Sequence, residues 1–488
     1  MCMTNLQIKE ALDALIANMR EAYHVPSIMM SVCRNGETFF CGGGLANVEQ
    51  NLPATPDTVY AIASASKAFI ATSLCILCDE GKLALDRPVR AYLPEFTMYD
   101  AYMSDHLTVC DALSHRSGLP RHDLMWLNQP ELNIHEIIER LRYLPLAFEP
   151  RTRMHYQNHM FTLASVLVER VSGMPWQRFV ETRIFAPLGM KSSYAVSALY
   201  RDKIENQSEP YAWRSGALCR LRFNNIENVG CAGSISSTVR DLARWSALQL
   251  GRGTLDGVRI YSEEMADRLH CPQMIIKKGE MFPYDFPEID FTSYGMGWFI
   301  ESYRGHKLVH HGGTIDGYKS LVGFLPREGV SFAVLTNLER NQTPAALGYA
   351  LCDLALGLEP IDWAQRFLSF MNDAGAAGAR QLEACRAAIA AAPPAAHKNA
   401  QYAGVYEHPG YGRVVVEEQD GALAIKMLSG VFALRGTGAD RFLVDASVEY
   451  GQMIPARFGD TLENEIDTLD LQLEEMIPGY MVTFRKLK

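Results

Sequence analysis

A serine and a lysine three residues apart offer the first chemistry in the chain. Ser64-Ala65-Ser66-Lys67 opens an apolar run and is the only S-x-x-K in the sequence. Positions i and i+3 of a helix share a face, so we expect both side chains to point the same way. A desolvated lysine can take a hydroxyl proton, and a helix N-terminus offers N–H groups to an oxyanion. The spacing therefore makes Ser64 a candidate nucleophile.

A tyrosine and an asparagine form the second candidate element. Tyr156-Gln157-Asn158 is the only Y-x-N in the chain and precedes a helical pattern. A tyrosine near a cationic lysine can shuttle protons, and the Asn158 amide both donates and accepts hydrogen bonds. By itself, this pattern is also typical of a capping turn with a packed aromatic ring.

The third element is His311-Gly312-Gly313-Thr314, which lies in a strand pattern. Glycines there leave room for a substrate backbone along the strand, and the Thr314 N–H could be a second oxyanion donor. Neighbours on a strand point to opposite faces, so only one of His310 and His311 can line a site.

Rival chemistries have little support. The chain contains no G-x-S-x-G and no H-E-x-x-H, so neither a nucleophile elbow nor a zincin site has a candidate. Cys75 and Cys78 lie on an apolar helical run, which favours core packing. We expect no metal and no cofactor.

Length and charge limit the class of protein. At 488 residues the chain is expected to form about three domains or subdomains. Its net charge of −10 disfavours nucleic acid and anionic membranes as partners. The longest apolar span, 69–78, is too short for a bilayer. The 11 scattered cysteines are typical of reduced thiols, and the N-terminus lacks a basic segment followed by an apolar one. We therefore expect a cytoplasmic protein.

The elements that must position these residues predict an α+β fold. Arg34-Asn35-Gly36-Glu37 predicts a hairpin between two strands. A mostly helical section follows from about Ala61 to Leu250, and strand patterns return over 294–300, 307–311, 320–325 and 330–336. Strands at both ends can share one sheet only if the chain folds back. We expect an antiparallel sheet with flanking helices and a helical subdomain.

The C-terminal part has a different composition. Residues 374–396 contain 12 alanines and predict a helical connector. Short strand-like runs follow from Val405 to Phe484, at the spacing of an all-β barrel or sandwich.

The three elements, in this order, resemble serine hydrolases of the β-lactamase and penicillin-binding-protein superfamily, in the branch of class C β-lactamases, D-aminopeptidases and related esterases. The resemblance covers about Leu12 to Leu358. Its supporting stretches are 113–120, 232–242 and 294–298. The stretches 401–406 and 408–412 resemble the lipocalin-like β-domain appended to many such hydrolases. The expected domains are a hydrolase domain over 1–358, an alanine-rich helical connector over 359–397 and a β-barrel over 398–488.

The resemblance implies a metal-free acyl transfer in which Ser64 attacks an amide or ester. Lys67 and Tyr156 then move the proton, and which of the two is the base stays open. Asn158 orients the lysine and the acyl side chain, and the N–H groups of Ser64 and Thr314 hold the oxyanion. The resemblance also selects His311 and Gly313 for substrate binding, beside the five residues just named.

The substrate is less well specified. Penicillin-recognising members have K-T-G where this chain has His311-Gly312-Gly313, and an imidazole is mostly neutral at pH 7. Strong recognition of a β-lactam carboxylate is therefore not expected. The H-x-G version resembles D-aminopeptidases, D-peptide hydrolases and some esterases, and this resemblance favours short peptides or amides, including those with D-residues. A carboxylesterase or weak β-lactamase is the alternative, and a penicillin-recognising sensor or inactive scaffold is the alternative of another class. We expect a small-molecule or short-peptide partner, and a homo-oligomer stays open. We also hypothesise that the barrel packs near the active-site mouth, in its own or a neighbouring chain.

Overall fold

A computed structural model describes residues 3–196, 201–214, 216–224, 226–282, 284–428, 430–447, 451–461, 465–474 and 477–487. They form two compact units. The first holds the residues up to Phe96, Ala101–Gly118 and Phe148–Met371. The second holds Thr97–Asp100, Leu119–Ala147 and the residues from Asn372 onward. Each unit is described by itself.

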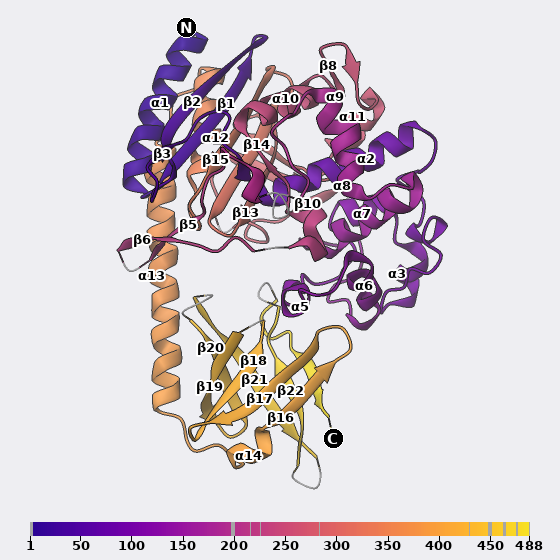
Figure 1. The fold of residues 1–488 in the computed structure, drawn as a ribbon, viewed down its shortest axis with the longest axis vertical. Helices are drawn as coiled ribbons and strands as arrows, with labels where there is room; N and C mark the ends of the chain where they lie inside the picture. The colour runs from indigo at the N-terminus through magenta and orange to yellow at the C-terminus, as the bar shows by residue number, and fades with distance from the viewer. Residues whose placement is uncertain are drawn as a thin grey trace. The chain divides into compact units, whose positions relative to one another are not determined.

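A nine-stranded antiparallel sheet is the framework of the first unit (Figure 1). The strand order is β10-β11-β12-β13-β14-β15-β1-β2-β3, so the N-terminal hairpin lies beside the last strand of the unit. The strands are β1 (Ser27–Arg34), β2 (Glu37–Asn47), β3 (Leu52–Pro53), β10 (Met274–Ile276), β11 (Ile289–Tyr294), β12 (Phe299–Tyr303), β13 (His306–Ile315), β14 (Tyr318–Leu325) and β15 (Val330–Thr336). The chain thus folds back as predicted, and the hairpin closes with Arg34 opposite Glu37.

Helices cover both faces of this sheet. Ile28, Met30 and Val32 share one core with α1 (Asn5–Ala22) and α12 (Thr343–Leu356). Their neighbours in sequence point the other way, and the Cys33 thiol contacts the Ala243 carbonyl of α10 (Val239–Leu250). The alternation of side chains along β1 therefore separates two helical layers.

The helical section between the strands is confirmed. Its helices are α2 (Lys67–Asp79), α3 (Ala101–His106), α4 (Val109–Leu113), α7 (His159–Ser172), α8 (Trp176–Val180), α9 (Ala186–Leu188) and α11 (Glu263–Leu269). Shorter turns are η1 (Ala63–Ser66), η2 (Val89–Ala91), η4 (Glu181–Phe185), η6 (Arg201–Lys203) and η7 (Glu227–Ala232). Three small strand pairs are β4 (Tyr60–Ala61) with β7 (Ser236–Ser237), β5 (Tyr211–Arg214) with β6 (Ala217–Arg220), and β8 (Thr254–Leu255) with β9 (Val258–Arg259).

One strand prediction is wrong. The pattern over 294–300 predicts a single strand, but β11 ends at Tyr294 and β12 begins at Phe299. The four residues between them form a turn in which Gly297 has a φ of 78°. A left-handed backbone suits glycine and breaks the strand despite the apolar run.

A closed antiparallel barrel forms most of the second unit (Figure 1). Its eight strands pair in chain order, and β23 closes on β16, as in the predicted all-β domain. They are β16 (Gly404–His408), β17 (Gly412–Gln419), β18 (Ala422–Met427), β19 (Gly430–Gly438), β20 (Arg441–Ala446), β21 (Gln452–Asp460), β22 (Ile466–Leu471) and β23 (Val482–Lys486). The rings of Tyr402, Phe442 and Phe458 pack together inside. The alanine-rich stretch lies in helix α13 (Trp363–Ala390), and α14 (Asn399–Tyr402) precedes the barrel.

Residues 119–147 belong to the same compact unit as the barrel. They form α5 (Asp123–Asn128), α6 (Ile134–Glu139) and η3 (Arg140–Tyr143). Asn128 Nδ2 donates to the Tyr411 carbonyl at 2.8 Å, and Gln129 Nε2 donates to the Gly410 carbonyl at 2.9 Å. An excursion from the helical section is thus bound to the barrel by side chains that recognise its backbone. Within the described ranges, no helix has the length and apolar character needed to cross a bilayer.

Candidate active site

Ser64 lies in the short helical turn η1, directly after a strained residue. Ala63 has a φ of 49°, a left-handed conformation that costs a non-glycine residue about 1–2 kcal/mol. The preceding residue is held on both sides. The Ile62 carbonyl accepts a hydrogen bond from Ser320 Oγ at 2.6 Å, and its N–H donates to the Ile235 carbonyl at 2.9 Å. The fold therefore compensates for the strain at the position that presents the half-buried Ser64.

Lys67 is the first residue of α2 and is fully buried. Its Nζ lies 3.1 Å from Ser64 Oγ, 2.7 Å from Asn158 Oδ1 and 2.9 Å from the Ala232 carbonyl oxygen. The sequence-predicted serine, lysine and asparagine therefore meet at one amine. Ala232 is a partner that the sequence did not predict.

Tyr156 packs beside this amine. Lys67 Nζ lies 4.9 Å from the centre of the Tyr156 ring, and the ring is buried. The His115 ring lies 4.3 Å from the Tyr156 ring, measured between ring centres. A hydrogen bond also fixes the loop that carries Tyr156, because Gln157 Nε2 donates to Ser117 Oγ at 2.7 Å.

His311 lies on β13 and uses both ring nitrogens. Nδ1 lies 2.7 Å from the Gly312 carbonyl, which only accepts, so Nδ1 carries the proton. Nε2 then accepts from the Tyr294 hydroxyl at 3.0 Å. Burial, together with the charge of Lys67, lowers the pKa of His311 to about 3. The imidazole is therefore neutral near pH 7 and carries no cation to this position.

His310 precedes His311 on β13 and has different polar partners. It is buried, stacks on Phe299 and lies 3.3 Å from Glu301 Oε1. The residue is packed, so of the two neighbouring histidines it is His311 that contacts Tyr294 at the candidate site.

The structure requires a glycine at position 313 for a reason other than the expected one. A Cβ atom there would overlap the Ile62 carbonyl oxygen and crowd Ala63. The glycine thus lets β13 approach η1 closely, and the neighbouring backbone already fills the space that was expected to admit a substrate. Thr314 is exposed on the same strand. Because β12 pairs with β13 only as far as His310, the described strands pair with just one side of β13 at Thr314.

The β-lactamase family matches residues 12–356, which is more than half of the chain. The chain belongs to the β-lactamase family. Members of this family are serine hydrolases, so the protein is a hydrolase of the β-lactamase and transpeptidase superfamily.

Relatives and solved structures agree with this assignment. An unguisins hydrolase of Aspergillus campestris is 27% identical over 414 residues, covering 81% of this chain and 75% of the relative. The octameric penicillin-binding protein homologue of Pyrococcus abyssi has a TM-score of 0.64 at 22% identity and covers 98% of this chain and 99% of its own. D-amino acid amidase of Ochrobactrum anthropi SV3 has a TM-score of 0.58 at 23% identity, covering 72% and 98%. The two structures support the fold.

An aromatic cluster borders the site of this β-lactamase-family protein. Tyr156, Tyr294 and Phe299 pack together, and Phe282 lies 5.0 Å from Phe299, measured between ring centres. Met281 and Phe282 are only half-buried. The cluster therefore presents apolar atoms beside the tyrosine.

Sequence reasoning missed several residues that shape the site. Tyr294 binds His311, and His115 supports Tyr156. Both lie in stretches that carry the family resemblance, 294–298 and 113–120. That resemblance was the available signal, but it gave no partner for either side chain, because each partner is distant in sequence.

Proposed function

We propose that this protein hydrolyses amide bonds of short peptides or amino-acid amides through an acyl-enzyme on Ser64. The observation that carries the proposal is the arrangement around Lys67, whose amine contacts Ser64 Oγ and two acceptor oxygens, Asn158 Oδ1 and the Ala232 carbonyl. The amine therefore links the serine hydroxyl to two fixed acceptors.

The contact with the serine suits proton exchange. A neutral amine would donate its two N–H groups to Asn158 and Ala232 and would aim its lone pair at the Ser64 hydroxyl. An ammonium would fill the same three directions with N–H groups. Both protonation states therefore satisfy these three contacts, which allows a proton to pass between Ser64 and Lys67.

The proposed reaction has two steps, acylation of Ser64 and hydrolysis of the acyl-enzyme. Ser64 Oγ bonds to the substrate carbonyl carbon while its proton passes to the Lys67–Tyr156 pair, and the oxyanion accepts hydrogen bonds from the N–H groups of Ser64 and Thr314. The bond to the leaving nitrogen then breaks as Tyr156 delivers a proton to it. Water attacks the ester carbonyl, its proton returns through the same groups, and Ser64 leaves as the hydroxyl.

Substrate preference follows from charge and surface. The neutral His311 offers no cation to the carboxylate of a β-lactam. The half-buried Met281 and Phe282 suit an apolar acyl side chain. One structural neighbour is a D-amino acid amidase bound to L-phenylalanine amide, and one relative is an unguisins hydrolase. The name of the amidase supports an amide substrate, and that of the relative supports hydrolysis.

Intact-mass measurement combined with a substrate panel tests the proposal. The protein is incubated with a fluorophosphonate and, separately, with a penicillin. Turnover is measured on D- and L-aminoacyl amides and on short esters. We expect a fluorophosphonate adduct that is absent in Ser64→Ala, and turnover of apolar aminoacyl amides. Labelling of Ser64→Ala would refute the nucleophile. A stable penicillin adduct without amide turnover would support a sensor instead.

We further propose that the chain forms a homo-oligomer. The support is the octameric neighbour, which matches nearly the whole chain, barrel included. Light scattering after size-exclusion chromatography is expected to give a multiple of the 54.5 kDa chain mass. A single-chain mass at micromolar concentration would contradict this.

A further inference from the structure

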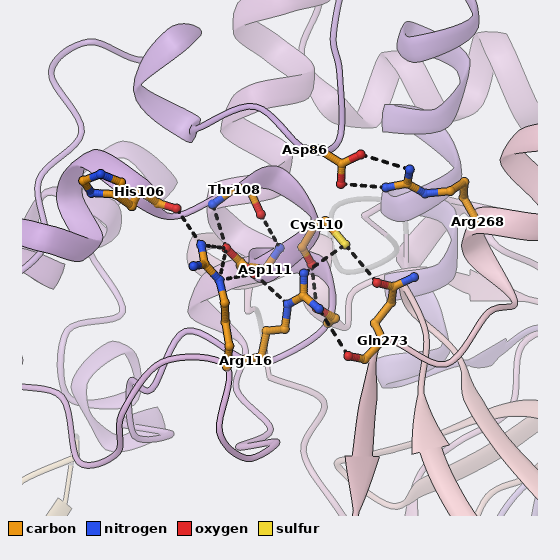
Figure 2. A network of polar contacts seen from close by, with 10 residues as sticks. Asp86, His106, Thr108, Cys110, Asp111, Arg116, Arg268 and Gln273 are labelled. Atoms are coloured by element: carbon orange, nitrogen blue, oxygen red, sulfur yellow. Dashed lines mark hydrogen bonds and ion pairs between the residues drawn. The ribbon is translucent and has the colours of Figure 1, made fainter.

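A buried carboxylate on α4 joins two segments of chain that lead into the candidate site. Asp111 is fully buried and accepts hydrogen bonds from Arg116 Nε at 2.6 Å and from Arg151 Nη2 at 2.8 Å. Figure 2 shows Asp111 and Arg116 at the centre of a polar network. Two guanidinium groups from distant parts of the sequence therefore share one carboxylate.

The two arginines mark the base of the 119–147 excursion. The Arg151 N–H donates to the Arg116 carbonyl at 2.8 Å, and the Phe148 N–H donates to the Gly118 carbonyl at 3.3 Å. The segment before the excursion thus lies against the segment after it. The second of these segments continues directly to Tyr156.

The first segment contacts the Tyr156 loop through hydrogen bonds to His115. The His155 N–H donates to the His115 carbonyl at 2.9 Å, and the Gln157 N–H donates to His115 Nδ1 at 3.3 Å. The residues on either side of Tyr156 are therefore both bound to His115, whose ring packs on the tyrosine.

Backbone strain at two residues gives independent support. Arg151 has a φ of 64° and His115 a φ of 54°, both left-handed conformations of non-glycine residues. Such strain persists where surrounding contacts over-determine the backbone, and it clusters at functional sites. Here the side chain of Arg151 binds Asp111, and that of His115 binds the Tyr156 loop.

We propose that Asp111 is a positioning residue for Tyr156. By binding Arg116 and Arg151 together, it fixes His115 against the Tyr156 ring and holds the tyrosine loop at Lys67. The inference rests on the proposed function, in which Tyr156 protonates the leaving group.

A purely structural role would have another signature. Asp111 Oδ2 also accepts the Thr108 N–H at 3.0 Å and so caps α4. Burial raises the pKa of Asp111, but hydrogen bonds from Arg151 and Thr108 and the charge of Arg116 hold it below its ordinary value. Losing a charged cap would lower stability for any substrate alike, so the test must compare substrates.

Two substrates with one acyl group make this comparison. A p-nitrophenyl ester has a leaving group that needs no proton, whereas an alkyl amide needs one. Tyr156→Phe should therefore slow the amide far more than the ester. We expect Asp111→Asn to show the same pattern, with kcat for the amide lower by about 10- to 100-fold, kcat for the ester lower by less than about threefold, and KM little changed for both.

Two further variants protect the test against misfolding. Arg151→Gly removes the ion pair at a backbone position that suits glycine, so it should fold and show the same substrate pattern. Asp353→Asn is the matched control. Asp353 lies on α12, is also a buried carboxylate, and accepts a hydrogen bond from Arg304 Nη1 at 2.7 Å. This control should lower the melting temperature and leave the ratio of ester to amide rates unchanged.

The outcomes separate the inference from the proposed function. Equal slowing of both substrates by Asp111→Asn while Tyr156→Phe slows the amide selectively, or unchanged rates in Asp111→Asn and Arg151→Gly, would overturn the positioning role and leave the Ser64 chemistry standing. Turnover that persists in Ser64→Ala would overturn the proposed function, and the positioning role with it.

Discussion

The candidate site and the barrel interior both bury aromatic rings, but the rings at the site pack against a buried amine, whereas a central group of rings in the barrel packs ring against ring. Inside the barrel, Tyr402, Phe442 and Phe458 contact one another with ring centres 4.8–5.4 Å apart. At the site, the Lys67 amine lies 4.9 Å from the Tyr156 ring and needs directed acceptors. Buried apolar rings stabilise the barrel through the area they remove from water, whereas a buried amine costs free energy unless its donors are bound.

This difference predicts opposite consequences of substitution. Changes at the site should alter rates more than stability, because its residues are arranged for chemistry. Changes in the barrel should alter stability more than rates, because its rings contribute mainly apolar area.

The largest expected effect is that of Ser64→Ala. It removes the proposed nucleophile of the half-buried Ser64 and leaves the backbone of η1 unchanged in sequence on either side. Turnover of any amide or ester substrate should fall by at least about 10⁴-fold, with the melting temperature within a few degrees of the parent. Steady-state kinetics measures the turnover, and calorimetry measures the melting temperature. A large loss of stability would place Ser64 in the same class as the barrel rings.

Lys67→Ala comes next. Without the amine, Ser64 loses the group 3.1 Å from its hydroxyl, and acylation should slow by about 10²- to 10⁴-fold. Single-turnover acylation by a chromogenic ester measures this step. Tyr402→Phe is the barrel control. It removes a buried hydroxyl bound to Asp440 and should leave the acylation rate unchanged. Unchanged acylation in Lys67→Ala would refute its assignment.

Phe458→Ala tests the barrel side of the comparison. The ring is buried against Tyr402 and Phe442, so truncation should cost about 3–5 kcal/mol of barrel stability. Hydrogen exchange of the barrel amides should increase, while hydrolysis of a short ester changes by less than about threefold. If ester hydrolysis were lost together with barrel protection, the barrel would have to take part in the chemistry.

The smallest effect, taken over one pH unit, is the pH dependence of stability. Burial lowers the pKa of His311 to about 3 at the site and that of His408 to about 4 in the barrel. Unfolded histidine has a pKa of about 6.5, so below this pH the unfolded chain binds protons that the folded chain does not. Stability should therefore fall as pH decreases from about 6.5 toward those values.

His311→Asn isolates this contribution. One proton changes stability by at most ~1.4 kcal/mol per pH unit, and the variant should lose stability less steeply than the parent below pH 6.5. His408→Asn should flatten the curve over a narrower range, because its pKa is lowered less. Urea unfolding at several pH values measures both slopes. Parallel curves would show that neither histidine is held neutral by the fold.

Much of the fold could be predicted because it follows from local patterns. The alternation of apolar residues and the turn residues between them predicted the barrel strands, and the Asn35-Gly36 dipeptide predicted the first hairpin. The same reasoning failed over 294–300, where an apolar run concealed a turn at Gly297. Backbone conformation at a single residue outweighed the hydropathy pattern there.

The candidate site could likewise be predicted only in part. Ser64 and Lys67 could be paired from helical spacing alone, whereas Tyr156, Asn158 and His311 were joined to them only by family resemblance. The Tyr294–His311 hydrogen bond and the Asp111 network could not be predicted, because they depend on which distant segments the fold brings together. The domain boundaries and the compartment stay predictions.

The central claim is that Ser64 carries the acyl group during turnover. Rapid acid quench of the protein with an apolar D-aminoacyl ester, followed by digestion and peptide mass mapping, tests this most directly. The account predicts one acyl group on the peptide that contains Ser64, formed at the rate of the single-turnover phase and absent in Ser64→Ala. An acyl group on another residue, or turnover with no covalent adduct at any quench time, would contradict it.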